Sequence, residues 1–375
     1  MRTKVKRTGH PLLEDLVFLS FIVSLLVMAY FVRPFPVFAA WFGFLISAYS
    51  VIANDSIQTI GTFLSSNKQY RWWLLWLYIS FIFFLTLFYS WFFFDGDVTH
   101  QRLQAKGFEQ APTYFYYLQI AAPIVLLVLT KYKIPVSTSF LVLGSFVGSS
   151  EALVQIIFKS FAGYGVAFSV GLGLFLLVSR LSRRLFVGEP STSWRVTQWL
   201  VSGWLWSIWL QQDLANIAVF LPRSLSVLEF SLFSGLIIVE LGVLLYLRGG
   251  RIQEIVTRKS DVTDPRSATL IDACYASVLW YFRNVNLIPM STTWIFLGLL
   301  AGRELGMWAR GTSKLRIRPL FKMVVSDVSK AFLGLAISII IALSVNPRVE
   351  VEEIQTEISS EVSEIIPDDL TSSED

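Results

Sequence analysis

The chain has 375 residues, of which 54% are hydrophobic and only 15% are charged, and its formal net charge is +4. Soluble domains average about 25% charged residues, so this composition excludes an ordinary soluble domain and indicates a membrane protein. Alternating ten-residue strands are absent, which argues against a transmembrane barrel, and no nucleic-acid-binding motif is present. No HExxH, CxxC, P-loop or Gly-x-Ser-x-Gly motif occurs, so we expect neither an enzyme nor a bound cofactor.

Hydropathy predicts an all-α polytopic membrane protein with eleven apolar segments, each long enough to cross a bilayer as a helix. Suppose that the N-terminus is cytoplasmic and that every segment crosses once. Of the 31 Lys and Arg residues, 22 then fall on the inner face and seven on the outer face. This asymmetry predicts a multi-pass protein of the cell membrane with a cytoplasmic N-terminus. The predicted segments are 12–32, 36–64, 73–95, 113–131, 137–159, 162–180, 195–221, 227–247, 267–284, 289–308 and 321–345.

Apart from the first helix, five segments precede a polar linker and five follow it. Five is odd, so the two groups cross the membrane in opposite directions. This predicts an inverted-topology repeat, the architecture in which a solute binds between the halves near the middle of the bilayer. The residues after Val345 are strongly acidic, which predicts a disordered tail. The predicted domains are a basic N-terminus with an extra helix (1–35), a first repeat (36–181), a linker (182–194), a second repeat (195–345) and the tail (346–375).

Each predicted repeat opens with a segment that carries an aspartate between two amides. The residues are Asn54, Asp55 and Gln58 in the first segment, and Gln212, Asp213 and Asn216 in the second. A carboxylate at the centre of a membrane helix costs about 2.5–3.5 kcal/mol. Residues three or four apart share a helix face, so each copy can present a carboxylate and two amides to one point. These oxygens suit a hard cation such as Na⁺, and a carboxylate can instead carry a proton. The plainer alternative is solvation or bonding between helices.

A second polar motif, Pro-x-Ser-Thr, also occurs once in each predicted repeat. Its hydroxyl residues are Ser137, Thr138 and Ser139 in the first copy, and Ser291, Thr292 and Thr293 in the second. Proline fits the first turn of a helix, so both motifs predict helix starts, with broken or re-entrant helices. The N–H groups and hydroxyls at such a start could hold a tetrahedral oxyanion without any Arg or Lys. The alternative is ordinary N-capping by Ser or Thr.

Glycines follow both Pro-x-Ser-Thr motifs at the same offset. Gly144 and Gly148 follow the first motif, and Gly298 and Gly302 follow the second. Small residues let helix backbones approach closely, so we expect these glycines to serve packing rather than binding.

The four polar motifs together resemble the inorganic phosphate transporter family. In that family each of two repeats carries a Gly-Ala-Asn-Asp-Val-Ala-Asn-type sequence and a Pro-Ile/Val-Ser-Thr-Thr-His-type sequence. This resemblance spans about 36–345 and implies a secondary transporter that couples phosphate symport to Na⁺ or H⁺. Asp55 and Asp213 would then couple the cation, holding Na⁺ directly if sodium is the coupling ion. The amides and the Ser and Thr residues of the four motifs would hold the anion.

The chain departs from the family pattern beside each motif. Phe140 and Trp294 stand where the family has histidine, and Val219-Phe220 replaces a common Gly-Pro. These changes remove polarity or flexibility near the expected site, which keeps sulfate or another oxyanion open as the substrate. They also keep open a transport-dead sensor or scaffold that binds an anion without moving it. Other expected partners are membrane lipid and, as a possibility, a second copy in a homodimer.

Overall fold

The computed structural model describes residues 11–105, 107–132, 134, 136–185, 188–247, 264–285, 287–311 and 317–345. Every regular element in these ranges is helical, so the predicted all-α class is confirmed. The basic residues 1–10, Pro135 and the predicted acidic tail, 346–375, lie outside the described residues. The elements are α1 (Pro11–Val32), α2 (Pro36–Val51), η1 (Ile52–Ser56), α3 (Ile57–Ser66), α4 (Trp72–Phe93), η2 (Arg102–Gln104), α5 (Tyr117–Lys131), α6 (Thr138–Leu141), η3 (Leu143–Phe146), α7 (Ser150–Leu185), α8 (Thr192–Ala218), α9 (Val227–Tyr246), α11 (Pro265–Val285), α12 (Thr292–Ala309) and α13 (Ile317–Val345).

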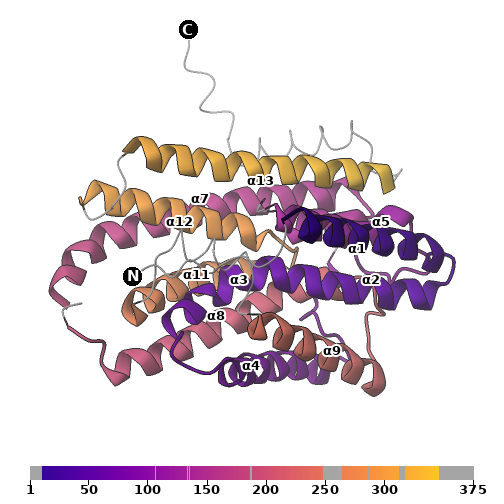
Figure 1. Ribbon diagram of the computed structural model, residues 1–375, viewed down its shortest axis with the longest axis horizontal. Helices are drawn as coiled ribbons and strands as arrows, with labels where there is room; N and C mark the ends of the chain where they lie inside the picture. The colour runs from indigo at the N-terminus through magenta and orange to yellow at the C-terminus, as the bar shows by residue number, and fades with distance from the viewer. Residues whose placement is uncertain are drawn as a thin grey trace, which may run out of the picture.

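The long helices lie roughly side by side along one direction, with α13, α7 and α12 at one edge and α4 and α9 at the other (Figure 1). Six spans in the described chain are long and apolar enough to cross a membrane: Asp15–Val32, Pro36–Asp55, Trp72–Phe93, Ser150–Val178, Val227–Tyr246 and Ile317–Val345. Many large apolar side chains of these helices face outward, as lipid contact requires. The protein is therefore a multi-pass membrane protein.

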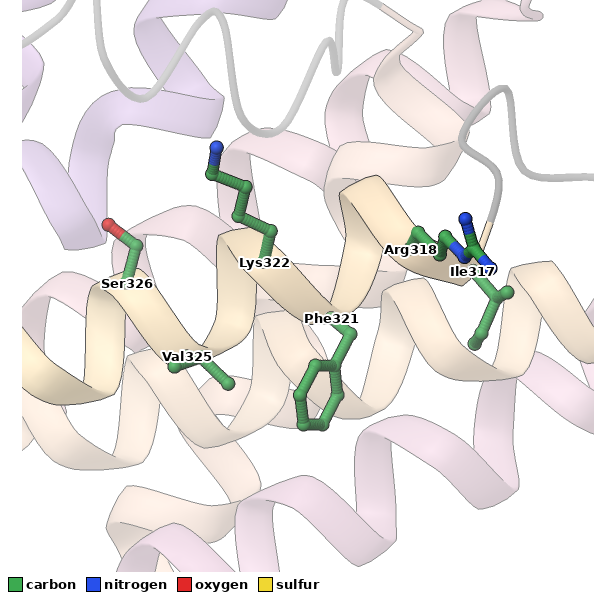
Figure 2. A pocket seen from close by; sticks show the side chains of 6 residues that line it. All are labelled: Ile317, Arg318, Phe321, Lys322, Val325 and Ser326. Carbon is green, nitrogen blue, oxygen red and sulfur yellow. The ribbon is translucent and has the colours of Figure 1, made fainter.

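The beginning of α13 has the mixed character of a membrane interface. Figure 2 shows Arg318 and Lys322 on this first part of the helix with Phe321 and Val325 beside them. Phe321 is 66% exposed and the two basic side chains are also exposed. Basic side chains with apolar stems and aromatic rings favour the zone between hydrocarbon and water, so this end of α13 is suited to the membrane surface.

The first Pro-x-Ser-Thr motif precedes a broken helix, as its sequence predicts. α6 has four residues and is followed by the short 3-10 helix η3. Gln119, in the first turn of α5, donates to the carbonyl of Ser145 at 3.0 Å. The chain after α5 thus returns along the whole length of α5 before α7 begins.

One predicted boundary is wrong. Hydropathy places a break between segments 137–159 and 162–180, whereas α7 runs without interruption from Ser150 to Leu185 and the break lies earlier, between η3 and α7. The polar residues Lys159 and Ser160 do not interrupt the helix, because both find partners inside the protein. Lys159 donates to the backbone carbonyl of Ile288, and the Ser160 hydroxyl donates to the backbone carbonyl of Ile156.

α7 and α12 pack against each other along a seam of glycines. A Cβ on Gly298 would collide with the backbone of Tyr164, and one on Gly302 would collide with the carbonyl of Phe168. The residue numbers of the contacting positions increase together along both helices, so the helices run in the same direction. Two of the predicted packing glycines therefore lie at a helix–helix contact, where only hydrogen fits.

Candidate functional site

Asp55 lies at the centre of a hydrogen-bond network that joins distant parts of the chain. It sits in η1, a single π-helical turn between α2 and α3, and its side chain is fully buried. Its carboxylate accepts hydrogen bonds from Asn54 Nδ2 at 2.7 Å, Thr138 Oγ1 at 2.6 Å and Thr293 Oγ1 at 3.4 Å. Gln58 Nε2 contributes a fourth donor at 3.4 Å. Both Pro-x-Ser-Thr motifs thus reach the same carboxylate, and π-turns of this kind are frequent at functional sites.

The second acidic motif joins this network through Asn216. Its Nδ2 lies 2.7 Å from Asp213 Oδ1, 2.9 Å from Thr138 Oγ1 and 3.3 Å from Ser139 Oγ. Thr138 therefore bridges the two acidic motifs, since it donates to Asp55 and accepts from Asn216. Asp55 and Asp213 also lie close enough for their charges to interact. The four polar motifs, which are up to 238 residues apart, converge in one buried cluster.

The two Pro-x-Ser-Thr motifs also bind each other. Ser139 Oγ donates to the carbonyl of Met290 at 3.1 Å. Thr293 Oγ1 lies 3.3 Å from the carbonyl of Val136, which is an alternative acceptor to Asp55 for its single hydrogen. The first serine of each motif has the plainer role of an N-cap: Ser137 Oγ accepts from Phe140 N at 3.2 Å, and Ser291 Oγ accepts from Trp294 N at 3.3 Å. Capping fixes the first turns of α6 and α12, and so positions the hydroxyls that follow.

Asn54 is tied to α5 as well as to Asp55. Its Nδ2 donates to the carbonyl of Val136 at 2.9 Å, and its Oδ1 accepts from Thr130 Oγ1 at 3.3 Å. Thr292 lies buried with its backbone carbonyl accepting from Tyr275 Oη at 3.0 Å. Thr130 and Tyr275 support the site, but they lie in apolar segments without a distinctive motif, so sequence reasoning missed them.

Three buried oxygen atoms in the cluster accept no hydrogen bond from the described residues. They are Asp213 Oδ2, Asn216 Oδ1 and Gln58 Oε1. A buried oxygen without a donor is rare and needs an explanation. Carboxylate and amide oxygens are the ligands that hard cations prefer, so these atoms fit a bound cation.

Gln212 does not bond to the carboxylates. Its Nε2 donates to the carbonyl of Leu279 at 3.2 Å, and its Oε1 accepts from Arg102, which lies in η2 within the connection between α4 and α5. Arg102 is only 1% exposed. Sequence reasoning placed this arginine in an outer loop, and nothing in the pattern of a polar connection shows that it folds into the core.

The connection between α4 and α5 also buries His100. Its pKa is lowered to about 3, chiefly by burial and further by the nearby charge of Arg283. The imidazole is therefore neutral at physiological pH. His100 stacks on Tyr89, so this connection is packed against α4 rather than extended into solvent.

A third buried carboxylate, Asp272 of α11, lies apart from the cluster. It accepts hydrogen bonds from Thr62 Oγ1 of α3 at 2.5 Å and from Ser202 Oγ of α8 at 2.6 Å. Both oxygens of this carboxylate have donors, and the contacts join three helices. Asp272 thus has the arrangement of a structural link between α3, α8 and α11.

Comparisons with known proteins support the fold. No family model matches the chain, and no curated protein matches it. Among solved structures, the chain is similar to one described as "The sodium-dependent phosphate transporter", with a TM-score of 0.51 and 16% sequence identity, over 90% of this chain and 99% of that one. The resemblance read from the four polar motifs is therefore confirmed at the level of the fold, which this chain shares with a phosphate transporter.

Proposed function

We propose that the protein is a divergent member of the inorganic phosphate transporter family and a secondary active transporter that couples phosphate uptake to Na⁺ or H⁺. The observation that carries the proposal is the meeting of Asp55 with both Pro-x-Ser-Thr motifs and, through Thr138 and Asn216, with Asp213. The shared fold with a sodium-dependent phosphate transporter supports the same function.

In this proposal the two halves of the chain are inverted repeats. The helix pairs support it, because several contacts occur in matching pairs. α2 packs on α5 as α8 packs on α11, and α4 packs on α8 as α9 packs on α2. α7 packs on α12 as α13 packs on α6 and η3. The first pair of contacts repeats within each half, and the other two cross between the halves with the partners exchanged, as a two-fold axis through the site would require.

The coupling cation would bind between Asp55 and Asp213. The three oxygens that lack donors, on Asp213, Asn216 and Gln58, support a cation at this point. Sodium would be held by these oxygens, whereas a proton would reside on one carboxylate. Either cation removes negative charge from the buried cluster, which makes binding of an anion beside it more favourable.

Transport by the purified, full-length protein in proteoliposomes tests the proposal. We expect uptake of labelled phosphate that depends on a Na⁺ or H⁺ gradient and that is lost in Asp55→Asn and Asp213→Asn. Asp272→Asn is the matched control, because it also removes a buried carboxylate with hydroxyl donors but lies outside the cluster.

The outcomes separate the alternatives. Gradient-driven uptake that persists in the double variant of Asp55 and Asp213 would contradict the coupling role. Sulfate uptake that outcompetes phosphate would keep the mechanism and change the substrate. Tight phosphate binding without flux in the wild type would identify a sensor and overturn the transporter proposal.

A further inference from the structure

Two buried cationic side chains meet at the connection between α11 and α12. Lys159 Nζ, from α7, donates to the carbonyl of Ile288 at 2.6 Å, and Arg102 Nη1 reaches the same carbonyl at 3.5 Å. The side chains are 9% and 1% exposed, respectively. Because one carbonyl oxygen accepts from both, the two positive charges lie close together. Like charges in a buried region are costly unless negative charge balances them.

The cationic pair borders the cluster of polar motifs. Arg102 also donates to the side chain of Gln212, directly before Asp213, and its charge interacts with that of Asp213. Ser160, next to Lys159, accepts a hydrogen bond from the backbone N–H of Ser291 at 2.8 Å. Arg102 therefore touches the acidic motif of α8, and Lys159 lies beside the start of α12.

Three of the six hydroxyls expected to hold an anion already have acceptors inside the protein. Thr138 donates to Asp55, Ser139 donates to the carbonyl of Met290, and Thr293 lies within reach of both Asp55 and the carbonyl of Val136. A hydroxyl has a single hydrogen to donate. These groups therefore serve the carboxylate and the backbone, and the strongest donors near the cluster are the guanidinium and ammonium groups.

We propose that Arg102 and Lys159 form the positive pole of the site and bind the tetrahedral oxyanion beside the start of α12. This inference rests on the proposed function and refines it. A guanidinium fork matches two oxygens of such an anion, and the N-terminus of the 18-residue helix α12 adds partial positive charge. Asp213 balances part of the charge of Arg102, so a cation bound at the carboxylates leaves an excess of positive charge beside them. A dianion neutralises that excess, which makes cation and anion binding mutually dependent.

Binding measurements on the full-length protein in detergent test the inference. The variants are Arg102→Gln and Lys159→Gln, with Arg102→Lys to retain the charge without the fork. Arg223→Gln is the matched control, since Arg223 holds the same connection through the carbonyls of Phe108 at 2.9 Å and Gln110 at 2.7 Å. Thermal shifts are recorded separately with inorganic phosphate, with sulfate and with Na⁺.

We expect the half-saturating phosphate concentration to rise about tenfold or more in both Gln variants, which corresponds to about 1.4 kcal/mol of lost binding. The half-saturating Na⁺ concentration should stay constant in Lys159→Gln. It should stay constant or fall in Arg102→Gln, because this variant removes a positive charge near Asp213. Arg102→Lys should recover part of the phosphate affinity. A purely structural role predicts the opposite, a parallel loss of both affinities.

Unchanged phosphate affinity in both Gln variants would overturn the inference, and so would parallel losses of phosphate and Na⁺ affinity that match Arg223→Gln. Failure of the proposed function gives a different result, namely no gradient-driven flux in the wild type. The binding comparison among the variants does not depend on flux, so the two failures can be distinguished.

Discussion

Substitution of Gly302 by alanine provides a sharp test of the α7–α12 packing. The added Cβ would collide with the carbonyl of Phe168 and lie 2.8 Å from Leu172 N. Both obstacles are backbone atoms of α7, so a side-chain rotation cannot relieve the contact, and the helices must separate. Overpacking of this kind costs about 1–3 kcal/mol. The matched control is Gly173→Ala, whose Cβ would meet nothing within 4 Å. Alanine at this position should raise the free energy of unfolding by about 0.5–1 kcal/mol through its higher helix propensity.

The assay is reversible unfolding of both variants in mixed micelles, followed by tryptophan fluorescence. We expect Gly302→Ala to be less stable than the wild type and Gly173→Ala to be equally or more stable, with about 2 kcal/mol between them. Gly302→Ala should also reduce uptake, because α12 begins at the motif that contributes Thr293 to Asp55. If Gly302→Ala is as stable as Gly173→Ala, the close approach of α7 and α12 is refuted.

The remaining predictions concern the site and the connection that covers it. Thr138→Val removes the bridge between the two acidic motifs, which includes a hydrogen bond to a charged group worth about 1.5–3 kcal/mol. The cation concentration that gives half-maximal uptake should therefore rise about tenfold or more. The control Thr86→Val, which breaks a Thr–Ser contact between α4 and α8, should leave that concentration unchanged. Ser291→Ala and Ser226→Ala each remove an N-cap and should each lose about 1 kcal/mol of stability, but only Ser291→Ala should slow uptake; equal uptake in both would contradict the placing of α12 at the site. His100 has a pKa lowered to about 3 in the fold, against about 6.5 when unfolded. The unfolded chain therefore binds more protons between these values, so stability falls as pH drops below about 6.5, by up to about 1.4 kcal/mol per pH unit. His100→Gln should flatten that part of the stability curve, and an unchanged slope would exclude His100 as the cause.

Much of the architecture could be predicted from the sequence because the bilayer imposes simple rules. Apolar runs of about 20 residues must be helical, and polar side chains inside them must meet partners. The pairs Asp55 with Asp213 and Ser137 with Ser291 therefore indicated a shared site, and their clusters do meet. The predicted boundary between 137–159 and 162–180 was wrong because hydropathy measures only the polarity of each residue. It cannot show that the polar side chain of Lys159 has a partner within the fold.

The sequence by itself determined that this is a helical membrane protein with two acidic and two helix-start motifs, because burial of charge in a bilayer is too costly to occur by accident. Only the tertiary structure decided which atoms meet. It placed Thr138 between Asp55 and Asn216, turned Gln212 toward Arg102, and brought Lys159 beside the start of α12. The physical reason is that side-chain hydrogen bonds are directional and short, so their partners depend on how helices remote in the chain pack, which local pattern does not encode.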